Sequence, residues 1–537
     1  MLMEFLDLLR VLSKSSPFAV KTLSDESKRG ELQLFKDYLY VKTEIEKDFE
    51  QKLEEALLGQ KKIIFLCGSS GDGKSEILTR YSKNEKYNKK ATFHLDATHS
   101  FKPKETAIER LDILFENYTN NEKILIVGIN TGMLANYAHA GKNSKIKEII
   151  ISYLERKDFL GLNFNEEIEF LDFKNYPNFK FYKNNIKSEF LSEIYTKLID
   201  EDDGNLLYKK YIALENKKTI HAVNYSFLKE LNIEKKLTEL IFSVRLMDDQ
   251  FITTRSLLDL FHCLLTSDKF VFDTLFECED NEILEKIKRF DPIKIRTKKI
   301  DNFIMSIRMG IKDEKLEDYL NDLKKIGVYI DLTKEINSLI RLFFVMQGKD
   351  FSNNYHNQFE GDLELKDIYN YKDIWLAHKN LADKAEFKKI NKLYTDRLVQ
   401  AINKYNSRNI SGINSDEFLL NTYGEFKILT KFEIIIDKKL LEMMNNKEID
   451  FLRCPVLVNN KRKIELNLNI NLFKLIEMIN EGYQPNKNDK NTIVMLDYII
   501  EQLRGALIDS NELIVINGDL RKTIKDIYGD ASEIKVV

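Results

Sequence analysis

Two hydrophobic periodicities alternate along the first third of the chain. Residues 1–60 carry apolar side chains every three or four positions, which predicts helices. Four short apolar runs then predict strands: KKIIFLCG at 61–68, ATFHLDAT at 91–98, KILIVGIN at 123–130 and EEIEFLDF at 166–173. Helical patterns separate them, from near Lys74, at 105–118 and at 146–159. This alternation predicts a doubly wound, mainly parallel α/β sheet over about 55–180.

The helical period dominates from residue 186 onward, and short strand-like runs return near residue 421. FKILTKFEIIID, CPVLVNN and KIELNLNI precede two helical segments, LFKLIEMIN and LDYIIEQLRGAL. A small α+β domain is expected there. The predicted organisation is an N-terminal helical segment (1–55), an α/β core (56–185), a helical lid (186–280), a mainly helical middle region (281–420) and the C-terminal domain (421–537).

One loop of the predicted core carries specific chemistry. CGSSGDGKSE at 67–76 lies between a predicted strand and a predicted helix, and it matches GxxxxGK[ST] without a gap. Such a loop wraps its N–H groups around an anion, and the helix N-terminus adds positive potential. Lys74 is expected to reach the β- and γ-phosphates of ATP, and Ser75 to bind Mg²⁺. The expected nucleotide-binding residues are Gly68, Ser69, Ser70, Gly71, Asp72, Gly73, Lys74, Ser75 and Glu76. The fold class is therefore predicted to be P-loop NTPase-like.

The acid that completes such a magnesium site is left open by the sequence. No apolar run ending in Asp-Glu follows the loop, and KILIVGIN ends in Asn130. Asp96 and Asp172 each end an apolar run, so both are candidates for the metal and for catalysis. Asn130 can orient a γ-phosphate or a water molecule but cannot act as a base. Asp112, inside the segment ERLDILF, is expected on a solvated helix face.

Arginines in the predicted lid are candidates for contact with the γ-phosphate. ITTRSLLDLF places Arg255 at a helix start, directly after two threonines. The alternative is an arginine on a solvated helix face, and both interpretations stay open. Arg245, in FSVRLMDD, is a second candidate of the same kind.

Composition limits the function classes. With 83 basic and 86 acidic residues, the chain is not a globally basic DNA-coating protein. A local basic segment, EKIKRFDPIKIRTKK at 285–299, can follow phosphates or form a solvated surface. No apolar stretch approaches the roughly 20 residues of a membrane span. The four cysteines form no CxxC pair, which fits a reducing, cytoplasmic setting and gives no zinc site. His94 and Asp96 share a strand face, but no third metal ligand is evident. No nuclease pattern is present either.

Several stretches together resemble one family. LSKSSPFAV at 12–20, LCGSSGDGKSEILTRY at 66–81, LDATHSFKP at 95–103 and GINTGMLANYA at 128–138 resemble the DptF (or DndF) family, as do ITTRSLLDL and EGYQPNKND further on. The resemblance implies a component of the phosphorothioation-dependent DNA restriction system of bacteria. It also implies two partner proteins, action against DNA that lacks sulfur in its backbone, and DNA contact that is direct or made through partners. Gly68, Gly73, Lys74 and Ser75 map onto the nucleotide loop, and Asn130 maps onto the segment near it.

The leading hypothesis is therefore a cytoplasmic, ATP-binding ATPase component of a DNA restriction complex, expected to be oligomeric. Its rival is a scaffold protein whose loop holds nucleotide without hydrolysing it, supported by the missing Asp-Glu pair. A helicase or motor is a third class, against which no further helicase motif is found.

Overall fold

The computed structural model describes residues 2–13, 26–59, 62–69, 71–97, 106–120, 123–155, 167–182, 185–231, 233–248, 252–407, 413–444, 452–508, 510–518, 520–526 and 534–536. The chain divides into two compact units. The first comprises Met1–Arg245 with Gln250–Glu364, and the second comprises Leu246–Asp249 with Leu365–Val537. The division at residue 365 falls inside the region 281–420 that the sequence suggested as one segment.

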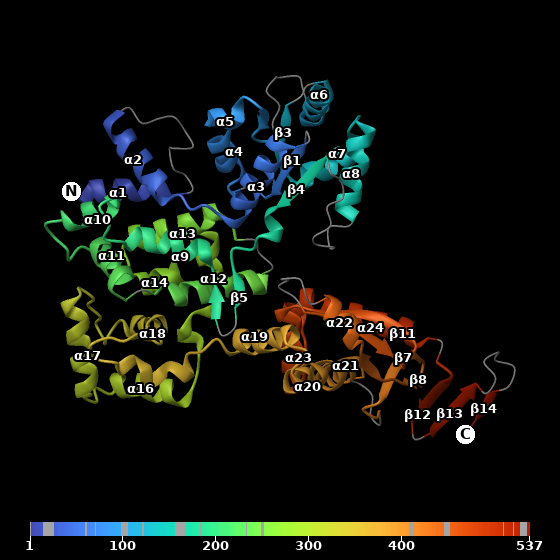
Figure 1. Cartoon of the computed structure of the whole chain (residues 1–537). Helices are drawn as coiled ribbons and strands as arrows, with labels where there is room; N and C mark the ends of the chain where they lie inside the picture. Colours follow the sequence, from blue (N-terminus) through green and yellow to red (C-terminus); the bar gives the residue numbers. More distant parts are fainter. Residues whose placement is uncertain are drawn as a thin grey trace. The chain divides into compact units, whose positions relative to one another are not determined.

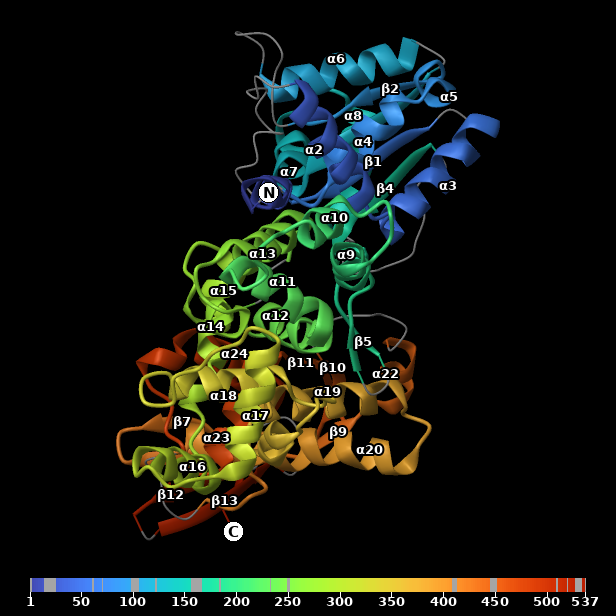
Figure 2. The same ribbon diagram turned by 90° about the vertical axis from the view of Figure 1, so that its left-hand side faces the viewer.

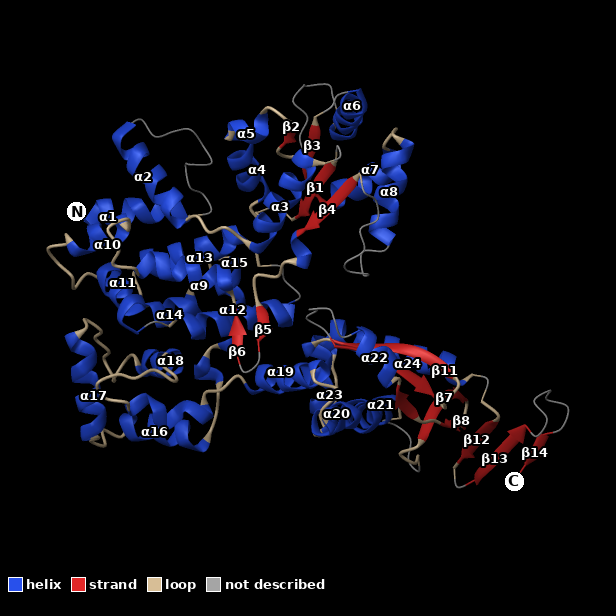
Figure 3. Cartoon of the chain, in the orientation of Figure 1, coloured by secondary structure: helices blue, strands red, loops and turns tan. Residues whose placement is uncertain are grey.

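A parallel sheet of four strands forms the centre of the first unit's N-terminal part (Figures 1 and 3). Its order is β2-β3-β1-β4, and every pair is parallel. The strands are β1 (Ile63–Gly68), β2 (Ala91–His94), β3 (Ile124–Asn130) and β4 (Ile168–Asp172). The predicted parallel α/β sheet is thus confirmed, with each strand lying in one of the four apolar runs.

Helices cover both faces of this sheet, so the sheet is buried on both sides as a parallel sheet requires. On one face, Phe65 and Val127 pack against apolar side chains of α6 (Ala107–Asn120), α7 (Thr131–Ala140) and α8 (Ser144–Glu155). On the other face, Ile64 and Leu66 pack against α3 (Glu44–Leu58) and α4 (Lys74–Lys83). The continuous apolar runs in the sequence reflect these two cores.

The rest of the first unit is mostly helical (Figure 2). The helices are α1 (Leu2–Leu9), α2 (Glu26–Leu39), α9 (Glu189–Ile199), α10 (Leu206–Ile212), α11 (Ile220–Leu231), α12 (Glu234–Asp248), α13 (Thr254–Thr266), α14 (Val271–Glu277), α15 (Glu282–Ile287), α16 (Lys298–Arg308), α17 (Glu314–Lys325) and α18 (Ile336–Val345). A short hairpin, β5 (Lys180–Tyr182) and β6 (Asn185–Lys187), leads into them and was not predicted. The helix α1 packs against α10 and α13, so the N-terminus belongs to this helical part.

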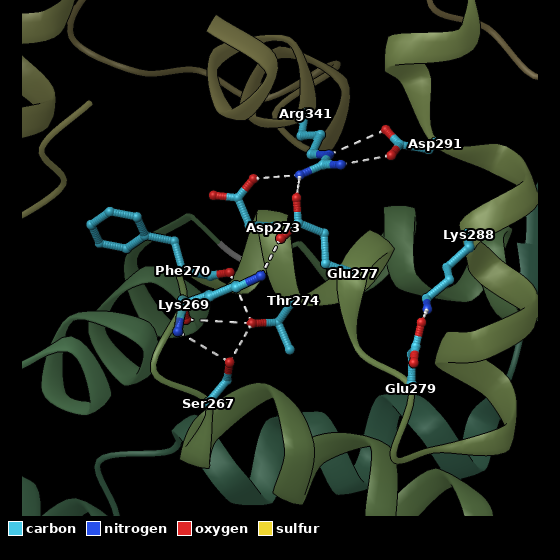
Figure 4. Close-up of polar contacts among 10 residues, drawn as sticks. All are labelled: Ser267, Lys269, Phe270, Asp273, Thr274, Glu277, Glu279, Lys288, Asp291 and Arg341. Carbon is cyan, nitrogen blue, oxygen red and sulfur yellow. Dashed lines mark hydrogen bonds and ion pairs between the residues drawn. The ribbon is translucent and has the colours of Figure 1, made fainter. Parts of the chain in front are cut away.

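A buried ion cluster joins α18 to α14 (Figure 4). The Arg341 guanidinium, whose side chain is 5% exposed, pairs with Asp291 at 2.7 Å and with Asp273 at 2.9 Å, and it also contacts Glu277. Burial raises the pKa of Asp273, and Arg341 opposes that rise. Arg341 thus pairs with two acids of α14 and with Asp291, which follows α15 in the chain.

The second unit combines helices with two antiparallel sheets. Its helices are α19 (Lys366–Lys379), α20 (Lys384–Asn391), α21 (Leu398–Asn406), α22 (Lys438–Met444), α23 (Ile470–Asn480) and α24 (Lys490–Leu507). One sheet has the order β11-β10-β9 and the other β14-β13-β12-β8-β7. Their strands are β7 (Glu417–Tyr423), β8 (Phe426–Lys431), β9 (Ile434–Ile436), β10 (Leu452–Val458), β11 (Arg462–Leu468), β12 (Glu512–Asn517), β13 (Leu520–Asp526) and β14 (Ile534–Val536). The strands after α24 were not predicted. Among the described helices, none has the length and apolar character needed to cross a bilayer.

Candidate functional site

A cavity of about 640 Å³ lies at the carboxyl ends of β1, β2 and β3. Its polar lining includes the segment 71–76, Asp96 after β2, Asn130 at the end of β3 and Arg255 on α13. The volume is in the range of small-molecule sites. The carboxyl edge of an open parallel sheet is also where such folds bind ligands, so position and size agree.

The loop between β1 and α4 has a conformation that requires glycine. Gly71 has φ +88° and Gly73 has φ +102°, both in the left-handed region. Gly73 is the N-cap of α4, so the first free N–H groups of that helix follow the loop directly. Ser70 lies outside the described residues. The loop therefore ends in a helix N-terminus that opens on the cavity, as an anion site requires.

Asp72 and Lys74 hold the loop together from inside. The Asp72 carboxylate accepts a hydrogen bond from the Ser69 N–H, and the Lys74 ammonium donates to the Ser69 carbonyl. Asp72 is 4% exposed, and its Oδ1 accepts no hydrogen bond from the described residues. Burial raises the pKa of Asp72 to about 6 and lowers the pKa of Lys74, although nearby acids favour the charged lysine. The loop thus contains a buried carboxylate and a desolvated ammonium.

The two candidate acids lie in different surroundings. Asp96 lines the cavity. Asp172 is 1% exposed and is not among the lining residues; its carboxylate accepts hydrogen bonds from the Tyr153 hydroxyl at 2.9 Å and the Lys174 N–H at 3.0 Å. The geometry therefore favours Asp96 for a metal at the cavity, and Asp172 caps the turn after β4.

Asn130 lies opposite Gly68 in the register of β3 and β1, at the edge of the cavity. Its Oδ1 accepts a hydrogen bond from the Met133 N–H at 2.6 Å and caps α7, which fixes the side chain.

A residue that sequence reasoning missed, Gly128, brings Asp96 near Asn130. A Cβ at this glycine would lie 2.6 Å from the Leu95 carbonyl oxygen. Ala97 donates to the Gly128 carbonyl at 2.9 Å, so the chain after β2 continues alongside β3. The available signal was a glycine inside an otherwise apolar strand, which often marks a close backbone approach.

Arg255 reaches the same cavity from the helical part of the unit. The Arg255 N–H donates to the Gly71 carbonyl at 3.4 Å, and the Thr254 hydroxyl donates to the Asp72 carbonyl at 3.5 Å. The side chain is exposed and lines the cavity. Arg245 instead donates to the Phe179 carbonyl at 3.5 Å and is not among the lining residues. Of the two candidate arginines, only Arg255 lines the cavity.

The N-terminal helices form another wall. Glu76, expected among the nucleotide-contacting residues, pairs with Lys36 of α2 at 3.0 Å and with Arg80 at 3.0 Å. The Arg80 guanidinium lies 3.6 Å from the centre of the Tyr40 ring and pairs with Asp37 at 3.1 Å. The apolar part of this wall comprises Val11, Leu12, Leu39 and Val41. Most of the segment 12–20 that supports the family resemblance lies outside the described residues.

One other expectation about a side chain changes. Asp112 is not solvated: it is 6% exposed and accepts hydrogen bonds from the Tyr137 hydroxyl at 2.7 Å and the Lys142 N–H at 2.9 Å. That expectation was wrong because α6 packs this position against the end of α7. His94, at the end of the strand that precedes the candidate Asp96, is buried, and burial lowers its pKa.

The basic segment 285–299 makes intramolecular contacts. Lys288 pairs with Glu279 at 2.5 Å, Arg296 pairs with Asp301 at 3.0 Å, and Lys294 donates to the Lys288 carbonyl at 2.6 Å. Contact between this segment and DNA stays a prediction.

Comparison with family models, with curated proteins and with solved structures gave no match for this chain.

Proposed function

We propose that the cavity binds ATP together with Mg²⁺. The donor set fits: the loop and the start of α4 offer N–H groups to phosphate oxygens, and Lys74 offers a mobile positive charge. Ser75 and Asp96 supply oxygen ligands of the kind that Mg²⁺ takes, with water completing its coordination. The observation that carries the proposal is that Lys74, Asp96, Asn130 and Arg255, from four separate segments, line one cavity.

The apolar wall fits the other end of a nucleotide. Leu12, Leu39 and Val41 are 2%, 5% and 7% exposed, and together with Ile194 and Leu258 they line the cavity. Small-molecule sites are lined largely by apolar side chains, and these residues supply such a lining for a purine base. The cavity therefore suits a whole nucleotide better than a free phosphate.

Arg255 gives the bound nucleotide a means to influence the helical part of the unit. The guanidinium stands at the start of α13, whose backbone and threonine already contact the loop. In the proposal, the γ-phosphate attracts Arg255 and draws α13 towards the loop, so that ATP and ADP favour different positions of this helix.

The biological role is proposed from the sequence resemblance. On that basis the chain is a cytoplasmic, ATP-binding component of a phosphorothioation-dependent restriction complex, acting with two partner proteins on unmodified DNA. The nucleotide cavity and its contact with α13 support a switch within such a complex. No nuclease role is assigned to this chain.

A non-hydrolysing nucleotide scaffold is the second candidate, because one specific observation favours it. The acids among the described lining residues are Glu46, Asp72, Glu76 and Asp96. Glu76 is held by two cations, and Glu46 accepts a hydrogen bond from the Tyr40 hydroxyl. Asp72 belongs to the loop itself. These three acids are thus already engaged, and none of them is assigned as the carboxylate that polarises water.

Phosphate release from the purified full-length chain separates the two candidates. An ATPase releases phosphate with Mg²⁺, at a rate that DNA or partner proteins raise, and Asp96→Asn abolishes that release. Asp172→Asn is the matched control: it should leave the turnover of each folded molecule unchanged. ATP that binds but is never hydrolysed, with partners and DNA present, identifies the scaffold. Failure to bind ATP at all refutes both.

A further inference from the structure

Three potential metal ligands share one face of α13, away from its first turn. Asp259, His262 and Cys263 are spaced i, i+3 and i+4, which places them together on a helix. A carboxylate oxygen, a ring nitrogen and the thiol sulfur lie within 4.8 Å of one another. This is the kind of helical spacing by which two side chains one turn apart bind one metal ion.

A fourth ligand comes from the segment between α14 and α15. The Cys278 thiol lies within reach of the Cys263 thiol, although the two residues are 15 positions apart in sequence. Both cysteines are free and half-buried, so the group lies at the surface, where an ion can enter. The helix α13 packs against α14 and α15, which brings the four residues together (Figure 2).

The neighbourhood orients these ligands. Asp259 is 6% exposed and accepts a hydrogen bond at 3.0 Å from the Asn281 amide, which also caps α15. Such a partner fixes a carboxylate ligand in place. Burial lowers the pKa of His262; Asp259 opposes this effect and nearby Arg10 adds to it. The imidazole is therefore neutral at neutral pH, the form that binds metals.

We propose that Asp259, His262, Cys263 and Cys278 form a Zn²⁺ site that joins α13 to the connection between α14 and α15. Two thiolates, one imidazole and one carboxylate are a ligand set that zinc accepts in tetrahedral geometry. With bonds of roughly 2.0–2.3 Å, zinc holds its ligand atoms about 3.3–3.8 Å apart, so shifts of about 1 Å bring the three ligand atoms of α13 to these distances, and Cys278 must turn towards them. The sequence did not predict this site because its two cysteines do not form a CxxC pair.

Binding at this site must release protons. Zinc binds cysteine as the thiolate, so it displaces a thiol proton and its affinity increases with pH. Because α13 begins at the nucleotide cavity, the ion also fixes the helix that carries Arg255. The site itself does not depend on nucleotide binding.

The test uses the full-length chain, reduced and freed of metal, titrated with Zn²⁺ against a chromophoric chelator and separately with Co²⁺. We expect one equivalent of either ion, a thiolate-to-cobalt charge-transfer band, and affinity that rises with pH. Cys263→Ser and Cys278→Ser each weaken zinc binding at least about 100-fold. Cys454→Ser, which removes a buried cysteine of the second unit, and His139→Ala, which removes an exposed histidine, leave it unchanged.

The cobalt spectrum of the unaltered chain needs no variant to fold. Absence of the thiolate band, or no uptake of zinc, overturns the proposal. It is also overturned if Cys454→Ser weakens zinc binding as much as Cys278→Ser does. The proposal is likewise overturned if the freshly purified chain contains a Cys263–Cys278 disulfide and, after reduction, takes up no zinc.

Discussion

Asp72→Asn tests the electrostatics of the loop between β1 and α4, the proposed phosphate site. The substitution keeps the shape of the side chain and leaves an oxygen to accept the Ser69 N–H, but it removes the charge. The pKa of Asp72 is raised from 3.8 to about 6 by burial, so the folded chain binds its proton more tightly than the unfolded chain does. Ionised Asp72 therefore destabilises the fold, and stability is lost as the pH rises from about 4 through 6.

The size of the effect follows from these two pKa values. The cost of Asp72 is about 1.6 kcal/mol at pH 5 and about 3 kcal/mol at pH 8. Asp72→Asn should thus be more stable, and its advantage should grow by about 1.4 kcal/mol between these pH values. Removing a negative charge beside the phosphates should also strengthen ATP binding about tenfold at pH 8.

Native-state hydrogen exchange of β1 and α4 peptides in the full-length chain is the suitable stability assay. The one tryptophan, Trp375, lies in the second unit and does not report on the loop. ATP titrations at pH 6 and pH 8 complete the experiment. The unaltered chain is titrated in parallel, so that the effect of protonation of ATP itself on affinity can be subtracted. A stability difference that does not change with pH, or ATP affinity that falls in Asp72→Asn, refutes this account of the loop.

Three further changes test other parts of the structure. Arg341→Met leaves Asp273 and Asp291 buried without their cation (Figure 4), so it should destabilise the first unit by about 3–5 kcal/mol. Hydrogen exchange of α14 and α18 peptides measures this loss of stability, and a loss below about 1 kcal/mol contradicts the role given to the buried cluster. Gly128→Ala pushes the Leu95 backbone, and with it the neighbouring Asp96, away from β3. Calorimetry should then show that ATP binding with Mg²⁺ is weakened more than ATP binding without Mg²⁺, and equal effects speak against a metal role for Asp96. Arg255→Ala should lower affinity for ATP about tenfold and leave affinity for ADP nearly unchanged; an equal loss for both nucleotides excludes contact with the γ-phosphate.

Local patterns sufficed for the α/β core. The run IIFL followed by a glycine loop and a helix predicted β1, the loop and α4, because each depends on neighbours in sequence. The order β2-β3-β1-β4 depends on pairing between distant strands, which no local pattern contains. The choice between Asp96 and Asp172 depended on that order, since both end an apolar run and only the folded chain separates their surroundings.

Other features required contacts across the unit. Asp112 has the spacing of a polar helix position, yet it is buried and accepts hydrogen bonds from the Tyr137 hydroxyl and the Lys142 N–H. The wall that α2 contributes through Lys36 could not be inferred, because the Lys36–Glu76 pair joins residues 40 apart. The grouping of Cys263 with Cys278 is of the same kind. The side chains of such groups come from segments that are distant in sequence and meet only in the folded chain, so their sequence spacing does not predict the contact.

The central claim is that this cavity binds ATP, and the most direct test is a calorimetric titration of the full-length chain and of Lys74→Ala with ATP and Mg²⁺. Lys83→Ala is the matched control, since Lys83 is an exposed lysine at the other end of the same helix. One ATP should bind the unaltered chain and the control with equal affinity, and Lys74→Ala should bind at least about 100-fold more weakly. Equal ATP affinity in Lys74→Ala and the unaltered chain would contradict the assignment of this cavity as the nucleotide site.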